Sequence, residues 1–183
     1  MPKFRKPDTT GTYETLGLHR ELNIELISAS DRVAVLLGAS IIDLHLERLL
    51  AAFMIDDEDE VDRLLSSKSQ NAPLGTMAAR TKAAYCLGLI SDVELADIDT
   101  IRTIRNTFAH QLFDCSFDNV EARKACEGLQ LFTKIGRPPS EFSTRQKFTF
   151  AITTLESTLR YRASIVKRQA PAFKFTPPPA SAA

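Results

Sequence analysis

The helical spacing of apolar residues constrains this chain most, and it is clearest between residues 92 and 112. The apolar residues of this segment recur three or four positions apart: Ile101, Ile104, Phe108 and Leu112. Because a helix turns by about 100° per residue, this spacing predicts one helix with a buried stripe. Ser91, followed three residues later by Glu94, is the pattern of a capping box and indicates where the helix begins.

A row of polar residues runs beside that stripe. Its members are spaced four, three and four apart and so share one helix face: Asp99, Thr103, Asn106 and His110. Arg105 lies about 140° from His110 around the helix and needs its long stem to act with it. The row is therefore a candidate site, although the residues alone do not specify a reaction.

The helical period recurs along the rest of the chain, and no useful length of strand-like alternation interrupts it. Further helices are predicted over residues 12–27, 31–54, 56–65, 76–90, 119–129 and 143–167. We therefore expect an all-α fold, a single-domain bundle of about six to seven helices, over residues 12–168. A flexible leader (1–11) and a disordered Pro/Ala tail (169–183) flank the predicted bundle.

The predicted helix over residues 31–54 is the most apolar in the chain. Ser30 or Asp31 is suited to cap its start. Gly38, Ala39 and Ser40 have small side chains and leave room for a close helix neighbour. In the next long helix, over residues 76–90, Gly88 is expected to weaken the end.

Charged residues on these helices form a second set of candidates. Six are predicted to take part in binding: Asp43, Glu47, Arg80, Lys82, Asp99 and Arg102. Asp43 and Glu47 stand four apart on one face, which favours a surface or subunit-interface role. A metal site there would need a histidine at ligand spacing, and His45 points elsewhere. Arg80 and Lys82 are expected to project from their helix.

Overall charge excludes a general attraction for polyanions, since 23 bases balance 23 acids. The charges are nevertheless segregated: residues 56–62 carry six acids, and residues 137–183 carry eight bases against Glu141 and Glu156. Acids in the first turn of a helix are stabilised by its partial positive charge and need no ligand. The basic carboxyl end could contact a phosphate backbone, but a solvated helix face is the commoner explanation.

Cysteine usage and hydropathy indicate the cellular compartment of the protein. The three cysteines include no CxxC pair, which favours free thiols in a reducing compartment. A zinc site built from His110, Cys115 and Cys126 would lack the usual paired spacing, so no metal or cofactor is predicted. No signal peptide and no apolar run of about 18 residues is present, and we expect a cytoplasmic protein.

Several separated elements carry a resemblance to a known family. Pro73-Leu74-Gly75, Arg80-x-Lys82, Tyr85-x-Leu87-Gly88-x-Ile90, Ile104-Arg105 and His110 resemble the mannitol operon repressor (MltR-like) family over residues 31–128. The resemblance implies an all-helical regulator without a recognised helix-turn-helix. The residues agree, because no short glycine-containing turn joins two helices with an exposed basic second one.

A narrower resemblance concerns the first helix described. Arg105-Asn106-x-x-x-His110 is similar to the Arg-x4-6-His signature of HEPN domains, helical bundles that include metal-independent endoribonucleases. It implies a site paired across a dimer interface. There His110 would handle the 2′-hydroxyl or leaving-group proton, Arg105 would stabilise the phosphate, and Asn106 would orient groups.

Two functions and one structural role thus remain open. The preferred function is a transcriptional regulatory or protein-interaction module without its own DNA-binding motif, which forms a homodimer and binds a protein partner. The alternative is a HEPN-type ribonuclease acting on RNA, a toxin component, for which enzyme status stays undecided. In the structural role, the polar row fixes helix packing or dimer register, with a protonated His110 favoured by free carbonyls at the helix end.

Overall fold

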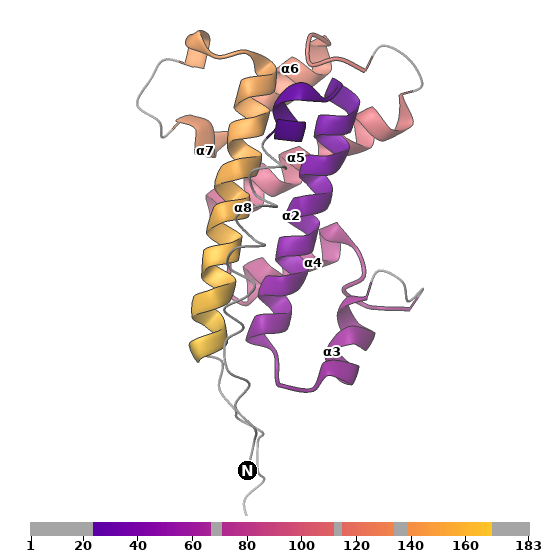
Figure 1. The fold of residues 1–183 in the computed structure, drawn as a ribbon, viewed down its shortest axis with the longest axis vertical. Helices are drawn as coiled ribbons and strands as arrows, with labels where there is room; N and C mark the ends of the chain where they lie inside the picture. The colour runs from indigo at the N-terminus through magenta and orange to yellow at the C-terminus, as the bar shows by residue number, and fades with distance from the viewer. Residues whose placement is uncertain (1–23, 67–70, 112–114, 134–138, 170–183) are drawn as a thin grey trace, which may run out of the picture.

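The computed structural model describes residues 24–66, 71–111, 115–133 and 139–169. In these ranges every regular element is helical: α2 (Asp31–Phe53), α3 (Glu58–Leu65), α4 (Met77–Cys86), α5 (Asp92–His110), α6 (Val120–Glu127), α7 (Gln130–Thr133), the short 3-10 helix η1 (Pro139–Glu141) and α8 (Thr144–Gln169) (Figure 1). The predicted all-α class is confirmed. Residues 24–28 are also helical, whereas the leader, Leu112 and most of the tail lie outside the described residues.

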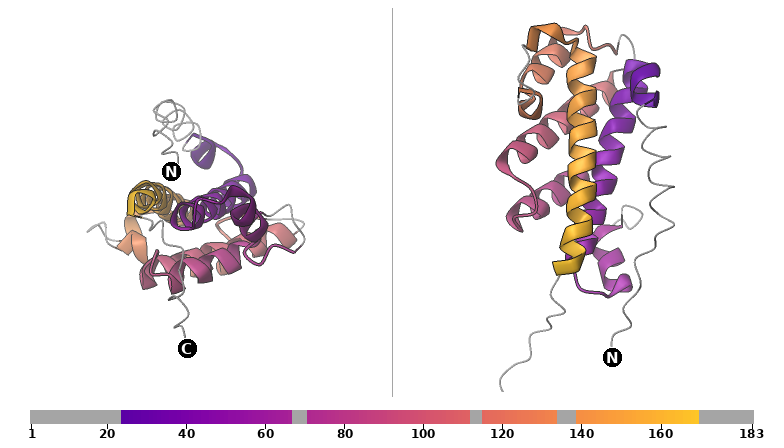
Figure 2. Two further views of the ribbon diagram at one scale, coloured as in Figure 1. Left: turned by 90° about the horizontal axis from the view of Figure 1, so that it is seen from below. Right: turned by 60° about the vertical axis from the view of Figure 1, so that its left-hand side comes forward.

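The two long helices α2 and α8 lie side by side, and α4 and α5 cover one side of the pair (Figures 1 and 2). Gly38 is buried where α2 meets α8, and a Cβ placed there would lie 3.0 Å from Cγ1 of Ile152. The expected close helix neighbour is thus α8. Phe108 of α5 and Phe148 of α8 both contact Phe117, so the core continues between the layers.

Local capping explains where the helices begin. The side chain of Ser30 accepts from the backbone N–H of Val33 and caps α2. Ser91 and Glu94 form the predicted capping box of α5. Before α8, the hydroxyl of Ser143 accepts from the N–H of Gln146 at 3.2 Å. These starts match the prediction because a cap depends on residues within one turn.

The predicted helix over 76–90 was too long, since α4 ends at Cys86. Gly88 has φ +69°, a left-handed conformation that glycine adopts without a Cβ penalty. The N–H of Gly88 donates to Tyr85 O, and the N–H of Leu89 donates to Ala84 O. This is a Schellman motif, which satisfies the last carbonyls and turns the chain toward α5.

The predicted helix over 119–129 was also too long, because it is interrupted at Gly128. The carboxylate of Asp97, buried in α5, accepts the backbone N–H groups of Gln130 and Leu131 at 2.7 and 2.8 Å. It thereby caps a separate short helix, α7. Long-range capping of this kind cannot be read from the spacing of α6.

No helix in the described part of the chain has both the length and the apolar character needed to cross a membrane.

Candidate interaction surface

Arg80 joins three elements from the interior. It was expected to project, but only 1% of the residue is exposed. Its Nη1 lies 2.6 Å from Oδ1 of Asp43 and its Nη2 lies 2.7 Å from Oε2 of Glu47, both on α2. Nη2 also donates to the carbonyl of Leu65, at the end of α3. The four-residue spacing of these acids, whose side chains are 29% and 37% exposed, therefore lets both contact one buried guanidinium.

A second charged contact joins the start of α5 to α8. Arg162 donates to both carboxylate oxygens of buried Glu94, at 3.1 and 3.0 Å, and to the carbonyl of Leu89 at 2.8 Å. Burial acts to raise the pKa of Glu94, but the hydrogen bonds from Arg162 and Ser91 outweigh it and leave the pKa lowered. The carboxylate is thus held in its charged form.

Charged groups also meet between α2 and α8. Nε2 of buried His45 lies 3.4 Å from Oε1 of Glu156, and the same carboxylate oxygen accepts from Nε of Arg160 at 3.1 Å. His45 is therefore a paired core residue, as its direction away from Asp43 suggested. Two of the bases that make the end of α8 basic, Arg160 and Arg162, are thus paired with the buried carboxylates of Glu156 and Glu94.

The other charged candidates lie on an exposed surface. We call the side formed by Lys82, Tyr85, Leu87, Asp99 and Arg102 the α4–α5 face. Nζ of Lys82 lies 3.9 Å from Asp99, and Nη2 of Arg102 lies 3.3 Å from the same carboxylate. The Lys82 side chain is 66% exposed. Such pairs are weak and open to competition from another molecule.

Tyr85 and Leu87 add apolar area to the α4–α5 face, with 38% and 46% of each residue exposed. Oη of Tyr85 donates to Oδ1 of Asp92 at 2.6 Å. This hydrogen bond and the negative charge of Asp92 raise the pKa of Tyr85. Sequence reasoning did not single out these two residues as a site, although both stand in the Tyr85-x-Leu87-Gly88 element. The feature of the sequence that could have identified them is two apolar residues close to a glycine turn.

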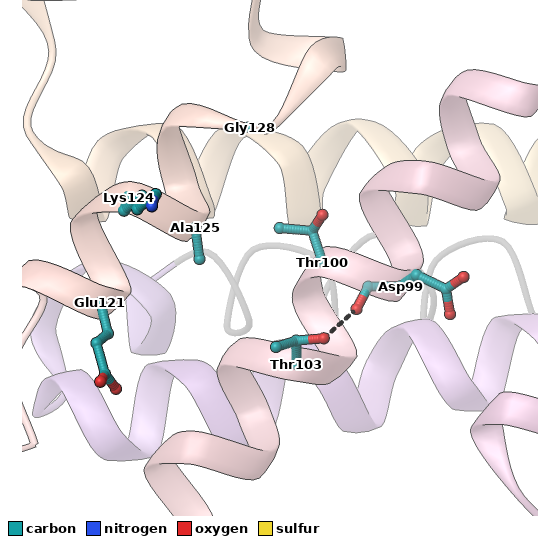
Figure 3. Close-up of a pocket in the computed structure, with 7 residues that line it drawn as sticks. All are labelled: Asp99, Thr100, Thr103, Glu121, Lys124, Ala125 and Gly128. Carbon is teal, nitrogen blue, oxygen red and sulfur yellow. Dashed lines mark hydrogen bonds between the residues drawn. The ribbon is translucent and has the colours of Figure 1, made fainter.

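An open hollow borders this face between α5 and α6. Its volume is about 550 Å³, and it is lined by Asp99, Thr100, Thr103, Glu121, Lys124, Ala125 and Gly128 (Figure 3). The hydroxyl of Thr103 donates to the carbonyl of Asp99 at 2.9 Å and so stays on its own helix. A shallow, polar-rimmed hollow of this kind suits a side chain of another protein better than an enclosed small molecule.

Arg105, Asn106 and His110 lie farther along α5. Nη1 of Arg105 donates to Oδ1 of Asn106 at 3.0 Å, and both Arg105 and His110 are exposed. Among the contacts of the described residues, none joins Arg105 to His110. The structure therefore does not bring the three residues together within one protomer. The acids that could have paired with Arg105 have other partners: Glu47 contacts Arg80, and Asp99 contacts Lys82 and Arg102.

The cysteines have separate environments. Cys86 is exposed, Cys115 is half-buried and accepts from Nη2 of Arg32 at 2.9 Å, and Cys126 is buried. Burial raises the pKa of Cys126 to about 12, so its thiol stays protonated. Within the described ranges, no three His, Cys, Asp or Glu side chains are grouped so that they could hold a metal ion.

One family model matches the chain, and solved structures share its fold. The family model described as mannitol repressor matches residues 24–168. One similar solved structure is the MtlR–HPr complex from Escherichia coli, with 20% identity, a TM-score of 0.64, and coverage of 78% of this chain and 98% of that one. Another is YggD from Shigella flexneri, described as a possible transcriptional regulator, with 16% identity, a TM-score of 0.62, and coverage of 77% and 96%. No curated protein matches the chain.

Proposed function

This chain belongs to the mannitol repressor family, and from that premise we propose that it is a regulatory protein which acts by binding another protein. In this proposal the protein has no DNA-binding motif of its own. It works in the cytoplasm, as a homodimer. The structurally similar chain from Escherichia coli was solved in complex with HPr, and we propose HPr as the partner here too.

The observation that carries the proposal is the α4–α5 face. It combines exposed apolar area on Tyr85 and Leu87 with the exposed charge of Lys82 and the half-buried charge of Arg102. Apolar residues supply most of the binding energy in protein interfaces, while charges at the rim orient the partner and raise the association rate. The adjoining hollow beside Asp99 offers a recess for a partner side chain.

Direct DNA binding through α8 is a weaker candidate on electrostatic grounds. Arg160 and Arg162 belong to the basic carboxyl end of the chain, which could contact a phosphate backbone. Each is already hydrogen-bonded to a buried carboxylate, Glu156 and Glu94. Turning either toward a phosphate would leave a buried acid without its guanidinium, which is costly.

Calorimetric titration of the full chain with HPr from the organism that this chain comes from tests the proposal. We expect Leu87→Asp to weaken binding by about tenfold or more, because it places a charge in a desolvated contact. Ile27→Asp is the matched control. Ile27 is 70% exposed and belongs to the helical residues 24–28, a segment that lies on the side of α2 away from α5 (Figure 2). No binding by the unchanged protein, or equal weakening by both variants, would overturn the assignment. Light scattering of the same samples measures the stoichiometry.

The alternative, a HEPN-type ribonuclease, is separated by a different assay. Purified protein is incubated with single-stranded RNA in EDTA, beside His110→Ala and Arg105→Ala. The interaction proposal expects no cleavage that depends on these residues. Cleavage that is lost in both variants would establish the enzyme instead, with the site completed by a second subunit.

A further inference from the structure

The turn between α4 and α5 carries Leu87, the more exposed of the two apolar residues on the α4–α5 face. Leu87 is 46% exposed, whereas Leu89 and Ile90, two and three residues later, are 6% and 5% exposed. Gly88 lies between them with φ +69°, and glycine restricts the backbone less than any other residue. The orientation of Leu87 therefore depends on how firmly the buried end of this turn is held.

An arginine of α8 holds that buried end. Nη1 of Arg162 donates to the carbonyl of Leu89 at 2.8 Å and to Oε2 of Glu94 at 3.1 Å, and its Nη2 donates to Oε1 of Glu94 at 3.0 Å. Oε2 of Glu94 also accepts from the backbone N–H of Ser91 at 2.7 Å. One guanidinium therefore fastens both the end of the turn and the start of α5 to α8.

This set of contacts requires a guanidinium in a shielded place. The planar fork of arginine can bind both oxygens of a carboxylate and a carbonyl at the same time, whereas the ammonium of lysine is a point charge on a flexible stem. The side chains of Arg162 and Glu94 are 31% and 6% exposed, so water competes for these contacts less than it does at a fully exposed pair. Arg162 can therefore keep the turn in one position.

A second arginine of α8 provides a matched comparison. The side chain of Arg160 is 38% exposed, and its Nε lies 3.1 Å from Oε1 of the buried Glu156. Glu156 lies four residues earlier in the same helix, so this ion pair does not fasten α8 to the turn. The two arginines thus have similar exposure and each pairs with a buried acid, but only Arg162 binds residues next to Leu87.

We propose that Arg162 is a positioning residue for HPr binding: through Leu89 and Glu94 it fixes the turn, so that Leu87 faces the partner in one orientation. The inference rests on the proposed function, because it places Leu87 in the contact with HPr. A turn that is already fixed in the free protein lowers the entropic cost of ordering it in the complex. Arg162 acts on affinity in this way without touching HPr.

Calorimetric titration with HPr, in a double-mutant cycle of Arg162→Ala and Leu87→Ala, tests the proposal. Arg162→Ala should weaken binding by about three- to tenfold, because the turn must then be ordered on binding. In the Leu87→Ala background the same substitution should cost less than about twofold, since the side chain that it positions is gone. Arg160→Ala should leave the affinity unchanged. Equal losses in both backgrounds, no loss in either, or an equal loss in Arg160→Ala would overturn the proposal.

Hydrogen exchange of the same variants without HPr measures the turn directly. Arg162→Ala should speed exchange at the amides of residues 88–91 by at least about tenfold, while the amides of α2 and those of Arg160→Ala keep their rates. Arg162→Lys keeps a positive charge beside Glu94 and so supports the fold, but it lacks the fork and should show the same local change. Unchanged exchange at residues 88–91 in both Arg162 variants would overturn the proposal.

The two proposals fail in different ways. If the unchanged protein does not bind HPr, the proposed function is wrong, and the role of Arg162 in binding is wrong with it. If HPr binds and Leu87→Asp weakens binding, but the affinity does not respond to Arg162→Ala, the proposed function stands and only the inference about Arg162 is overturned.

Discussion

The interior of the bundle and the α4–α5 face use the same charged residue types in opposite ways. Inside, the guanidinium of Arg80 meets two carboxylates at 2.6 and 2.7 Å and is almost completely buried. On the face, the ammonium of Lys82 stands 3.9 Å from Asp99 and is mostly exposed. Both pairs link neighbouring helices, so the difference between them lies in solvation.

That difference decides which charges hold the fold and which remain available for a partner. A buried ion pair whose partner is removed leaves a charge without compensation, whereas water readily replaces an exposed partner. The interior pairs are therefore expected to govern stability, and the α4–α5 face is expected to govern binding. Four predictions test this division, beginning with the largest effect.

Arg80→Ala should lower the free energy of unfolding by about 2–4 kcal/mol, since it removes a fully buried side chain and the hydrogen bonds by which that side chain joins α4 to α2 and to the end of α3. Urea denaturation measures the change, with Lys82→Ala as the control in the same helix. The control should stay within about 0.5 kcal/mol of the unchanged protein. If both variants lost the same free energy of unfolding, the interior and exposed pairs would not differ in their effect on stability.

Glu94→Gln should cost about 2 kcal/mol at neutral pH, because a charge-assisted hydrogen bond from Arg162 is lost. The folded-state pKa of Glu94 is lowered from 4.5, so its contribution is complete above that value and is lost as the pH falls through the folded pKa. The variant should therefore lose less stability than the unchanged protein on acidification below about pH 4.5. Asp99→Asn is the control at a half-buried acid, whose pairs with Lys82 and Arg102 are longer than 3 Å. If the variant and the unchanged protein lost stability equally on acidification, Glu94 would not have this role.

Gly88→Ala should cost about 1 kcal/mol through the backbone alone. The residue has φ +69°, and an added Cβ would meet no atom within 4 Å, so no clash contributes. Thermal unfolding measures the loss, with Cys86→Ala as a nearby exposed control. Leu87 precedes this turn, so the variant also tests how the α4–α5 face is positioned. Partner binding should fall if the turn orients that face.

A double-mutant cycle of Lys82→Ala and Asp99→Ala should yield the smallest effect, a coupling of at most about 0.5 kcal/mol. The coupling should decline further in high salt, because exposed charges are screened. A coupling above about 1 kcal/mol that persists in high salt would place this pair with the interior contacts.

Residue spacing alone predicted most of the fold, and it did so wherever the deciding interactions are local. The starts of α2, α5 and α8 follow from caps within one turn, and the stripe of Ile101, Ile104 and Phe108 is buried as expected. The small residue Gly38 marked the contact with α8. The all-α class followed from the same periodicity.

The candidate site was predicted less well, since residue type does not reveal solvation. Asp43, Glu47 and Arg80 were grouped with Lys82, Asp99 and Arg102 because all are charged. The fold separates the two groups by burying Arg80. Tyr85 and Leu87 were quoted as family elements, but their exposure could not be inferred from apolar character.

The sequence by itself determined the helices, their caps and the apolar stripes, because these depend on groups a few residues apart. Only the tertiary structure decided which charges are buried, where Asp97 starts a new helix, and which side of α4 and α5 faces water. Those outcomes depend on contacts between different elements; Asp97 and Gln130, for example, are 33 residues apart. A charged side chain pairs with whatever group the packing of whole helices places beside it.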